Sequence, residues 1–201
     1  MKTEKFTATN TTMLLIDHQV GTMSWCRSIP QELVRNNTRA LARSAKALDM
    51  PLILTSSMEE YAQGPLIKDL EEIAPEECAC RVKRIGVVNA FDDPIYKAAV
   101  MATGRKNLIM AGLTNDVCIV YPAMSAVEEG FNVQVVVDAG GSPTQIADET
   151  ALRRMERAGV TLTSTNQLIA ELAGSWINEA GSKLIQILFE EVLVHLGKAS
   201  S

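Results

Sequence analysis

The sequence predicts an α/β protein built around a doubly wound, mostly parallel sheet of six strands, with helices on both faces. Short apolar runs of strand length alternate along the chain with longer segments of helical periodicity. Such alternation is typical of βαβ units, whose strands are buried on both faces and therefore read as continuous apolar runs. With 201 residues and 47% hydrophobic content, the chain can bury one sizeable core, so we expect a single domain over residues 1–201.

The first half of the chain alternates as this fold class requires. The apolar run Met13–Ile16 predicts a first strand, and Pro30–Leu48 predicts an amphipathic helix that begins near a proline. A second strand is expected at Leu52–Thr55. Leu66–Ile73 follows as a short helix and Cys80–Lys83 as a third strand.

The second half continues the alternation and ends in a separate helix. We expect a helix at Pro94–Thr103, a strand at Asn107–Ala111, a helix at Cys118–Glu129, a strand at Val133–Val137, a helix at Thr144–Ala158 and a strand at Val160–Thr163. The tail Ser182–Leu196 predicts a helix that is apolar over a wider arc than one packing stripe needs, which favours a contact with another subunit. Its His195 is interpreted as a packed or surface residue.

Composition excludes several classes of partner. The net charge is -5 and no run of Lys or Arg occurs, so the chain lacks the electrostatic footprint that nucleic acid or an anionic membrane surface requires. No apolar run approaches the ~20 residues of a membrane span. The four cysteines are spaced as neither a disulfide framework nor a zinc ribbon. We therefore expect a soluble cytoplasmic protein with free thiols.

Cys118 is a candidate nucleophile because it follows a predicted strand and a glycine turn, at the expected start of a helix. There, unpaired backbone N–H groups and the positive end of the helix dipole favour a thiolate, and the same groups can bind an oxyanion. The alternative is that Cys118 is a small buried hydrophobic residue, as free cysteines usually are.

The expected strand order, 3-2-1-4-5-6, brings a carboxylate to this thiol. Asp17 ends strand one and Cys118 follows strand four, and these two strands are neighbours in that order. Ligands bind outside the carboxyl ends of such strands, at the point where the order reverses. Both residues are therefore expected in one crevice, although Asp17 could equally cap a turn.

Six segments in consistent order carry a family resemblance from about Thr11 to Glu171. They are LLIDHQ (14–19), NNTRAL (36–41), PLILTSS (51–57), NAFDDP (89–94), LIMAGLTNDVCIVYPAMSAVEEGF (108–131) and VVVDAGGS (135–142). With them the chain resembles the isochorismatase-like cysteine hydrolases, most closely those of the YcaC type. The resemblance implies a three-layer Rossmann-like fold that carries an Asp–Lys–Cys catalytic trio.

The resemblance places Asp17 on the catalytic aspartate and Cys118 on the nucleophile. The lysine position, seven residues before the aromatic Phe91, holds Arg84 instead. Lys83 is adjacent, but neighbouring side chains of an extended segment point to opposite faces. We therefore interpret Arg84 as the catalytic cation, which keeps its charge permanently but cannot shuttle a proton.

The resemblance also implies a non-proline cis peptide between Leu113 and Thr114, with the Thr114 and Cys118 amides as oxyanion donors. Asn115 replaces a threonine of many relatives and is a candidate for substrate binding. Gln19, beside Asp17, is a substrate-binding or a structural hydrogen-bonding group. Phe91 lines the pocket or belongs to the ordinary core.

Neither a metal nor a cofactor is expected. Nicotinamidase-like relatives bind a metal through an Asp-x-His arrangement with a further histidine nearby, whereas His18 is the sole histidine in the catalytic half of this chain.

The expected function is a cysteine-dependent hydrolase that cleaves a small amide or related C–N bond through a thioester. A homo-oligomer, a tetramer or octamer by resemblance, is expected, with a small-molecule substrate. One alternative is hydrolysis of an isochorismate-type vinyl ether, and another is a weakly active oligomeric scaffold that binds a ligand. A scaffold needs no unusually acidic thiol, whereas the enzyme requires a Cys118 that reacts well below the unperturbed thiol pKa of about 8.5.

Overall fold

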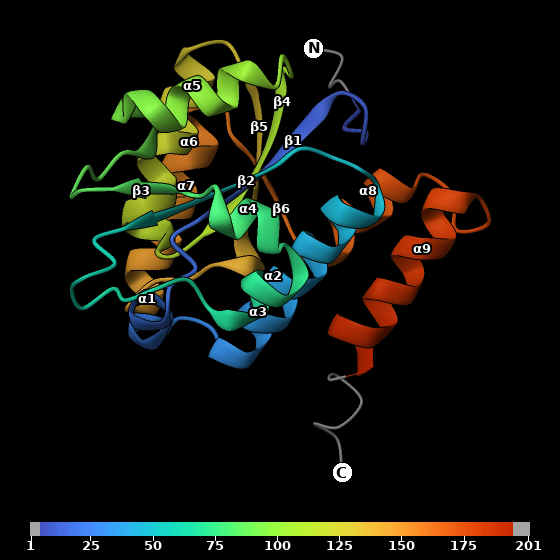
Figure 1. Ribbon diagram of the computed structural model, residues 1–201, viewed down its shortest axis with the longest axis horizontal. Helices are drawn as coiled ribbons and strands as arrows, with labels where there is room; N and C mark the ends of the chain where they lie inside the picture. Colours follow the sequence, from blue (N-terminus) through green and yellow to red (C-terminus); the bar gives the residue numbers. More distant parts are fainter. Residues whose placement is uncertain (1–4, 195–201) are drawn as a thin grey trace.

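A computed structural model describes residues 5–194, and its sheet has six parallel strands in the order β3-β2-β1-β4-β5-β6 (Figure 1). This confirms the predicted fold class and strand order. The strands are β1 (Thr11–Ile16), β2 (Leu52–Ser57), β3 (Val82–Arg84), β4 (Asn107–Gly112), β5 (Asn132–Val136) and β6 (Thr161–Thr163). Strand β1 is central, because it pairs with β2 on one side and with β4 on the other.

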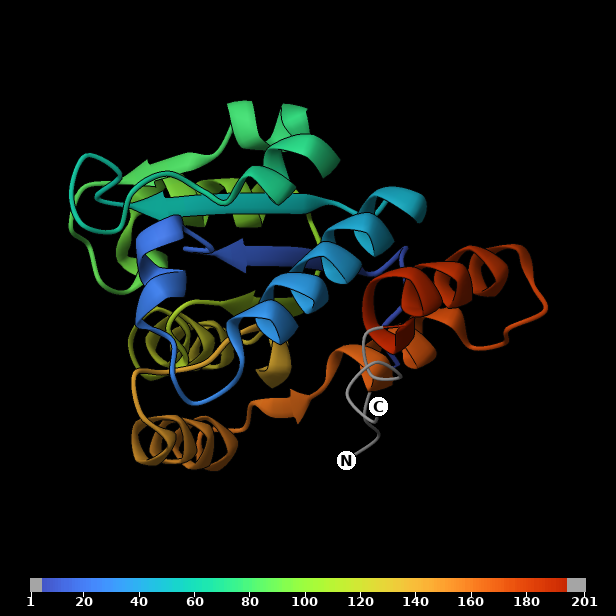
Figure 2. The same ribbon diagram turned by 90° about the horizontal axis from the view of Figure 1, so that it is seen from below.

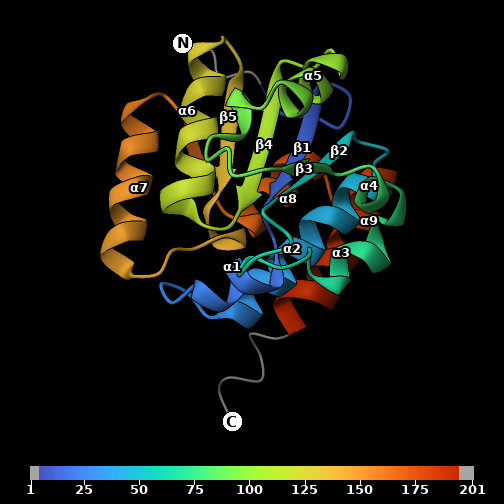
Figure 3. The same cartoon turned by 60° about the vertical axis from the view of Figure 1, so that its left-hand side comes forward.

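Helices cover both faces of the sheet (Figure 3). One layer contains α5 (Pro94–Ala102), α6 (Val120–Glu128) and α7 (Gln145–Arg157), and the other contains α2 (Gln31–Ala47), α8 (Thr165–Ala173) and α9 (Glu179–Leu188). Three shorter helices are α1 (Val20–Trp25), α3 (Lys68–Ile73) and α4 (Pro75–Ala79).

Alternation along β1 explains why both faces must be covered. Met13 and Leu15 belong to the apolar cluster beneath α2, α8 and α9, whereas Leu14 and Ile16 belong to the cluster beneath α5, α6 and α7. Successive side chains of a strand point to opposite faces, so a strand that is apolar at every position needs a layer on each side. All six residues of β1 are buried.

The carboxyl ends of the strands lie together at one edge of the sheet, where ligands bind in this fold class. In Figure 2 the arrowheads of β1 and β2 both point to the side where α1 lies, while α9 lies at the opposite end.

The predicted boundaries of the strands and helices agree with the structure to within a few residues, but helices α1, α4 and α8 were not predicted. Among the described residues, no helix has the length and hydrophobicity needed to cross a bilayer.

The C-terminal segment packs on its own chain. Helix α9 continues into a π-helical turn, Phe189–Leu193, and buries Leu184, Ile187, Leu188 and Val192 in the cluster beneath α2. Intramolecular packing thus covers most of the apolar arc that had suggested a subunit contact, and Phe189 stays exposed. The last residues of the predicted helix, including His195, lie outside the described residues.

Candidate active site

Asp17, Arg84 and Cys118 come together at the carboxyl ends of three strands. Asp17 directly follows β1, Arg84 is the last residue of β3, and Cys118 lies in a π-helical turn, Asn115–Ile119, after β4. The Leu113 N–H donates to the Ile16 carbonyl at 3.0 Å and so fastens the end of β4 to the end of β1. The convergence of carboxylate and thiol that the strand order predicted is present.

Asp17 is completely buried and adopts a left-handed backbone conformation, with φ of 55°. Non-glycine residues rarely adopt positive φ, and aspartate and asparagine are among those that tolerate it best. Three hydrogen bonds fix this backbone. The Asp17 N–H donates to the Thr55 carbonyl at 3.0 Å, and the Asp17 carbonyl accepts from the Thr22 hydroxyl at 2.6 Å and from the Gln19 N–H at 2.7 Å.

The two carboxylate oxygens of Asp17 have different surroundings. Oδ2 accepts a hydrogen bond from Arg84 Nη2, whereas Oδ1 is buried without a hydrogen-bond partner of regular geometry. Burial raises the pKa of the Asp17 carboxyl above its usual value, while the charge and hydrogen bond of Arg84 and the nearby Cys118 thiol lower it. The net direction is upward, which makes Asp17 a better proton acceptor than an exposed aspartate.

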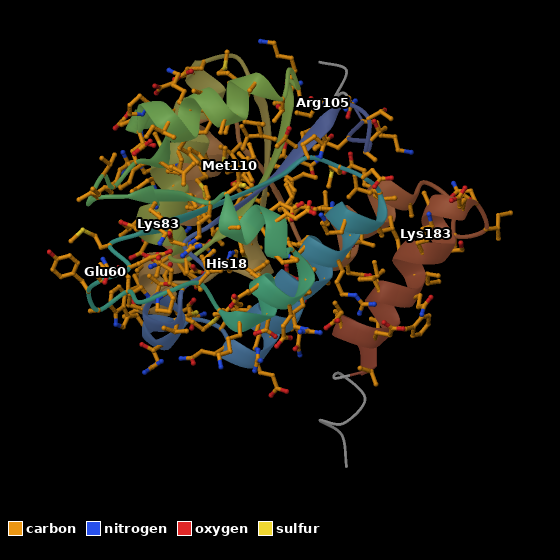
Figure 4. The ribbon with its side chains drawn as sticks, viewed as in Figure 1. His18, Glu60, Lys83, Arg105, Met110 and Lys183 are labelled. Carbon is orange, nitrogen blue, oxygen red and sulfur yellow. The ribbon has the colours of Figure 1, made fainter. Side chains whose placement is uncertain are left out.

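Arg84, not Lys83, occupies the position beside Asp17. The Arg84 side chain is fully buried against Asp17, whereas Lys83 lies on the other face of β3, is 58% exposed and pairs with Glu59 at 3.1 Å. Figure 4 labels Lys83 near this edge of the sheet, whereas Arg105 lies at the other. The strand alternation that favoured Arg84 over its neighbour is thus observed.

Cys118 is half-buried and lies within a π-helical turn, while the regular helix α6 starts only at Val120. The predicted helix start at Cys118 is therefore displaced by two residues. The Val117 and Ile119 N–H groups both donate to the Thr114 carbonyl, at 3.2 and 3.1 Å, and these bonds shape the turn.

The electrostatics of Cys118 correct the expectation of an acidic thiol. Burial raises the pKa of the Cys118 thiol and the Asp17 carboxylate raises it further, while Arg84 and the Thr114 N–H act in the opposite direction. The net direction is upward, so desolvation and a neighbouring negative charge outweigh Arg84 and the Thr114 N–H. In the ligand-free site the sulfur is a neutral thiol and needs a base to remove its proton.

The predicted cis peptide between Leu113 and Thr114 is present. The Thr114 N–H lies within hydrogen-bonding reach of the Cys118 sulfur. One of the two expected oxyanion donors is therefore directed at the nucleophile.

Gln19 has a structural role. It is completely buried, its Nε2 donates to the Ser57 and Gly64 carbonyls, and its Oε1 accepts the Ser57 N–H at 2.9 Å. Every polar atom of this side chain is thus bound to backbone. The structure supports the structural alternative for Gln19 rather than substrate binding.

Asn115 and Phe91 are also buried. The Asn115 side chain donates to Asp148 at 3.1 Å and its N–H donates to the Gly141 carbonyl at 2.9 Å, which ties the turn of Cys118 to the segment after β5. Phe91 packs edge-to-face on Tyr96 and Phe131 within the apolar core. Asn115 thus lies in the same turn as Cys118, whereas Phe91 is an ordinary core residue.

The imidazole of His18 contacts the segment after β5. It is completely buried, and its Nε2 donates to the Ala139 carbonyl at 2.8 Å, while Nδ1 has no partner. Across residues 5–194, no group of three or more His, Cys, Asp or Glu side chains is arranged to hold a metal ion.

A groove of about 320 Å³ lies between the loop after Arg84 and the helix after Cys118. It is lined by Val88 and Asp92 from the first of these segments and by Tyr121 and Glu128 from the second. The chain neighbours of Arg84 and Cys118 that reach solvent are mostly apolar: Ile85 is 90% exposed and Val117 39%. Lys83 is the cation among these neighbours, and it pairs with Glu59 on the other face of β3.

Thr55 is the site residue that sequence reasoning missed. Its hydroxyl accepts from Arg84 Nε at 3.1 Å and donates to the Val82 carbonyl at 2.7 Å. The signal was a polar residue at the carboxyl end of a predicted strand beside strand one, which is where this fold class binds ligands.

Comparison with known proteins decides the family. The model of the isochorismatase domain family matches residues 11–167. The chain belongs to the isochorismatase family. The chain is also 40% identical over 167 residues to the probable hydrolase YcaC of Escherichia coli. The aligned region covers 83% of this chain and 79% of that protein.

Two solved structures of YcaC proteins share the fold over nearly the whole chain. YcaC from Pseudomonas aeruginosa, with hexane-2,5-diol and covalent acrylamide, has a TM-score of 0.91 at 34% identity and 99% and 97% coverage of the two chains. The Escherichia coli YcaC product, described as an octameric hydrolase of unknown specificity, has a TM-score of 0.89 at 34% identity, with 100% and 97% coverage. The chain is thus a YcaC-type hydrolase of the isochorismatase superfamily.

Proposed function

We propose that this protein is a cysteine hydrolase that cleaves a small amide or related C–N bond through a thioester. The observation that carries this proposal is the juxtaposition of the Cys118 thiol with a buried carboxylate that has one unpartnered oxygen, Asp17 Oδ1. A nucleophile and a base in contact form the minimal arrangement for acyl transfer.

In the first half of the reaction, Asp17 accepts the Cys118 proton as the sulfur attacks the carbonyl carbon. The Thr114 and Cys118 N–H groups stabilise the oxyanion of the tetrahedral intermediate. Protonated Asp17 then donates its proton to the leaving nitrogen, the C–N bond breaks and a free amine departs. Arg84 holds a positive charge beside Asp17 throughout and transfers no proton.

In the second half, Asp17 takes a proton from a water molecule that attacks the thioester carbonyl. The C–S bond breaks, a carboxylic acid is released and the proton returns to the Cys118 sulfur. Burial raises the pKa of both groups, so the thiol stays protonated until substrate arrives, and Asp17 is a stronger base than an exposed aspartate.

The arrangement of Arg84 favours an uncharged amide over an isochorismate-type vinyl ether. An isochorismate-like substrate carries carboxylates that need a cation, yet Arg84 directs its hydrogen bonds to Asp17, Thr55 and two backbone carbonyls. Vinyl-ether hydrolysis also proceeds by acid chemistry and gives a cysteine nucleophile no role.

The covalent acrylamide in the relative from Pseudomonas aeruginosa adds support. Acrylamide is a small neutral amide that couples to nucleophiles such as thiolates, so that fold can present a reactive group to a molecule of this size. For this chain we propose that Cys118 is that group.

The test is a screen of small uncharged amides with the wild-type protein and the Cys118→Ala variant. Turnover is expected with the wild type alone, and mass spectrometry of quenched reactions should find the acyl group on the peptide that holds Cys118. Turnover that persists in Cys118→Ala would refute the mechanism. Absence of turnover, together with release of an enol product from a vinyl ether, would favour the alternative.

We also propose that the protein is a homo-oligomer, by likeness to the octameric relative of the same fold. Analytical ultracentrifugation should give a mass of several 21.8 kDa chains. A monomer at micromolar concentration would contradict this.

A further inference from the structure

The guanidinium of Arg84 is held on every side by protein atoms. Nε donates to the Thr55 hydroxyl at 3.1 Å, and Nη1 donates to the Val87 carbonyl at 2.6 Å and, at 3.4 Å, to that of Val88. Only Nη2 meets Asp17. Three of the four contacts therefore do not involve the catalytic carboxylate.

Thr55 connects Asp17 and Arg84. It lies in β2 between Ile16 of β1 and Val82 of β3, the strands that end beside Asp17 and Arg84. Its carbonyl accepts the Asp17 N–H at 3.0 Å, and its hydroxyl accepts Arg84 Nε. One residue thus fixes both members of the ion pair, through its backbone and its side chain.

The direction of the Thr55 hydroxyl is determined by a third contact. The hydroxyl donates its proton to the Val82 carbonyl at 2.7 Å. A hydroxyl has a single proton, so the lone pairs that remain can only accept. Thr55 is completely buried, which leaves no water to replace it as an acceptor for Nε–H.

These contacts fit arginine and do not fit lysine. A guanidinium is a planar fork with separated donors, whereas an ammonium is one point charge at the end of a flexible stem. A lysine at position 84 would reach Asp17 only by leaving Thr55 or the carbonyls of Val87 and Val88 without a donor. Buried acceptors left in this way are costly.

We propose that Thr55 is a positioning residue, whose hydroxyl, together with the carbonyls of Val87 and Val88, holds Arg84 in the orientation that places its charge beside Asp17 and Cys118. The cation is then fixed before substrate binds. This inference rests on the proposed function for its catalytic meaning, but its test requires no substrate.

The charged and titratable groups that face Arg84 are Asp17 from β1, Cys118 from the turn after β4, and the buried phenol of Tyr96 from α5. Burial raises the pKa of Tyr96, so the phenol stays neutral near physiological pH. Arg84 lowers the pKa of the Cys118 thiol against burial and Asp17. A less firmly held Arg84 is therefore expected to make the thiol less acidic.

The experiment measures how fast iodoacetamide, a neutral reagent, alkylates Cys118 as pH is raised from about 6 to about 10. The reaction is followed on the peptide that contains Cys118, which separates it from the other three cysteines. Thr55→Val is expected to slow alkylation at pH 8 by between about threefold and tenfold and to move the profile to higher pH. Thr55→Ser keeps the hydroxyl and should recover most of the lost rate.

Thr12→Val is the matched control. Thr12 is also buried in a central strand, and its hydroxyl bonds Thr103 at 3.0 Å, at the amino end of β1. It should lower stability without moving the pH profile. Should Thr55→Val fail to fold, Thr55→Ala is measured in the same way.

A double-mutant cycle with Arg84→Lys then tests the pairing. Arg84→Lys is expected to lower the alkylation rate by about tenfold, and Thr55→Val should add little to it because the Nε–H donor is already gone. The proposal is overturned if Thr55→Val behaves as Thr12→Val does, or if its effect is equally large in the lysine background. Failure of every amide in the activity screen would weigh against the proposed function and leave this result unaffected.

Discussion

Arg84 and Asp17 form an ion pair in which both side chains are completely buried, although the two residues are 67 positions apart in the sequence. Bringing two charges out of water is costly, and it is offset here by the additional hydrogen bonds to Arg84. Removing one partner leaves the other as an uncompensated buried charge. The stability and the reactivity of the site should therefore depend on the same pair.

Arg84→Ala is expected to lower the free energy of unfolding by about 3–5 kcal/mol, because it leaves the Asp17 carboxylate unpaired. It should also slow Cys118 alkylation. Lys83→Ala is the control, since Lys83 is largely exposed, and its effect should stay within about 0.5 kcal/mol. Urea unfolding and alkylation rates check both variants, and a larger effect at Lys83 would show that Lys83, not Arg84, supplies the charge beside Asp17.

Cys118→Ser is expected to abolish turnover of any amide substrate while leaving the urea midpoint nearly unchanged. A hydroxyl is a far weaker nucleophile than a thiol under the same base, but it fills nearly the same space. Substrate binding measured by calorimetry should persist in the variant. Retention of full activity would rule out Cys118 as the nucleophile.

His18 should make the protein lose stability in acid. Burial lowers the pKa of His18 from 6.5 to about 4, so the unfolded chain binds more protons than the folded one between these values. The stabilisation from neutral His18 is present above about pH 6.5 and is lost as pH falls through about 4, a total of about 3 kcal/mol.

His18→Gln isolates the contribution of His18 protonation, because glutamine does not titrate and its side-chain amide can still donate to the Ala139 carbonyl. Urea unfolding at pH 7 and at pH 4.5 should show a smaller acid loss in the variant than in the wild type. Equal losses would assign the acid sensitivity to other groups.

Glu191 should hold the C-terminal segment on α2. Arg39 contacts it at 2.7 Å and Arg43 at 2.6 Å, and the Glu191 side chain is 7% exposed. Glu191→Ala is expected to cost about 1–3 kcal/mol and to speed hydrogen exchange in α9. Among residues 5–194, the adjacent and exposed Glu190 contacts only Arg43 and Gln186, so Glu190→Ala should change neither measurement appreciably.

Sequence reasoning predicted the sheet because its signals are strong in this fold. Buried parallel strands such as β1 and β4 read as continuous apolar runs, and regular alternation with helices leaves few possible strand orders. The short helices α1 and α4 lack a long periodic pattern and were missed. The π-helical turn at Cys118 was also missed, since nothing local distinguishes it from the start of an α-helix.

Sequence reasoning predicted that Asp17, Arg84 and Cys118 lie together, but it did not predict the direction in which the pKa of Cys118 shifts. Asp17 and Cys118 follow from strand order, and Arg84 from the alternation of side chains along β3 together with the family pattern. The pKa of Cys118 depends on how deeply the sulfur is buried and on how close Asp17 lies, and both are tertiary properties. The same holds for Gln19, whose polar atoms contact backbone that comes from a distant loop.

The left-handed conformation of Asp17 restricts which acids this position accepts. Glutamate adopts positive φ less readily. Its carboxyl group would also lie one bond further from the backbone, beyond the position at which the Asp17 carboxylate meets the Arg84 guanidinium. Asparagine keeps both the backbone and the outline of the side chain, so it alone removes the charge without moving the chain. A library of natural or designed variants should therefore tolerate only short side chains immediately after β1, whichever substrate the rest of the pocket is shaped to admit.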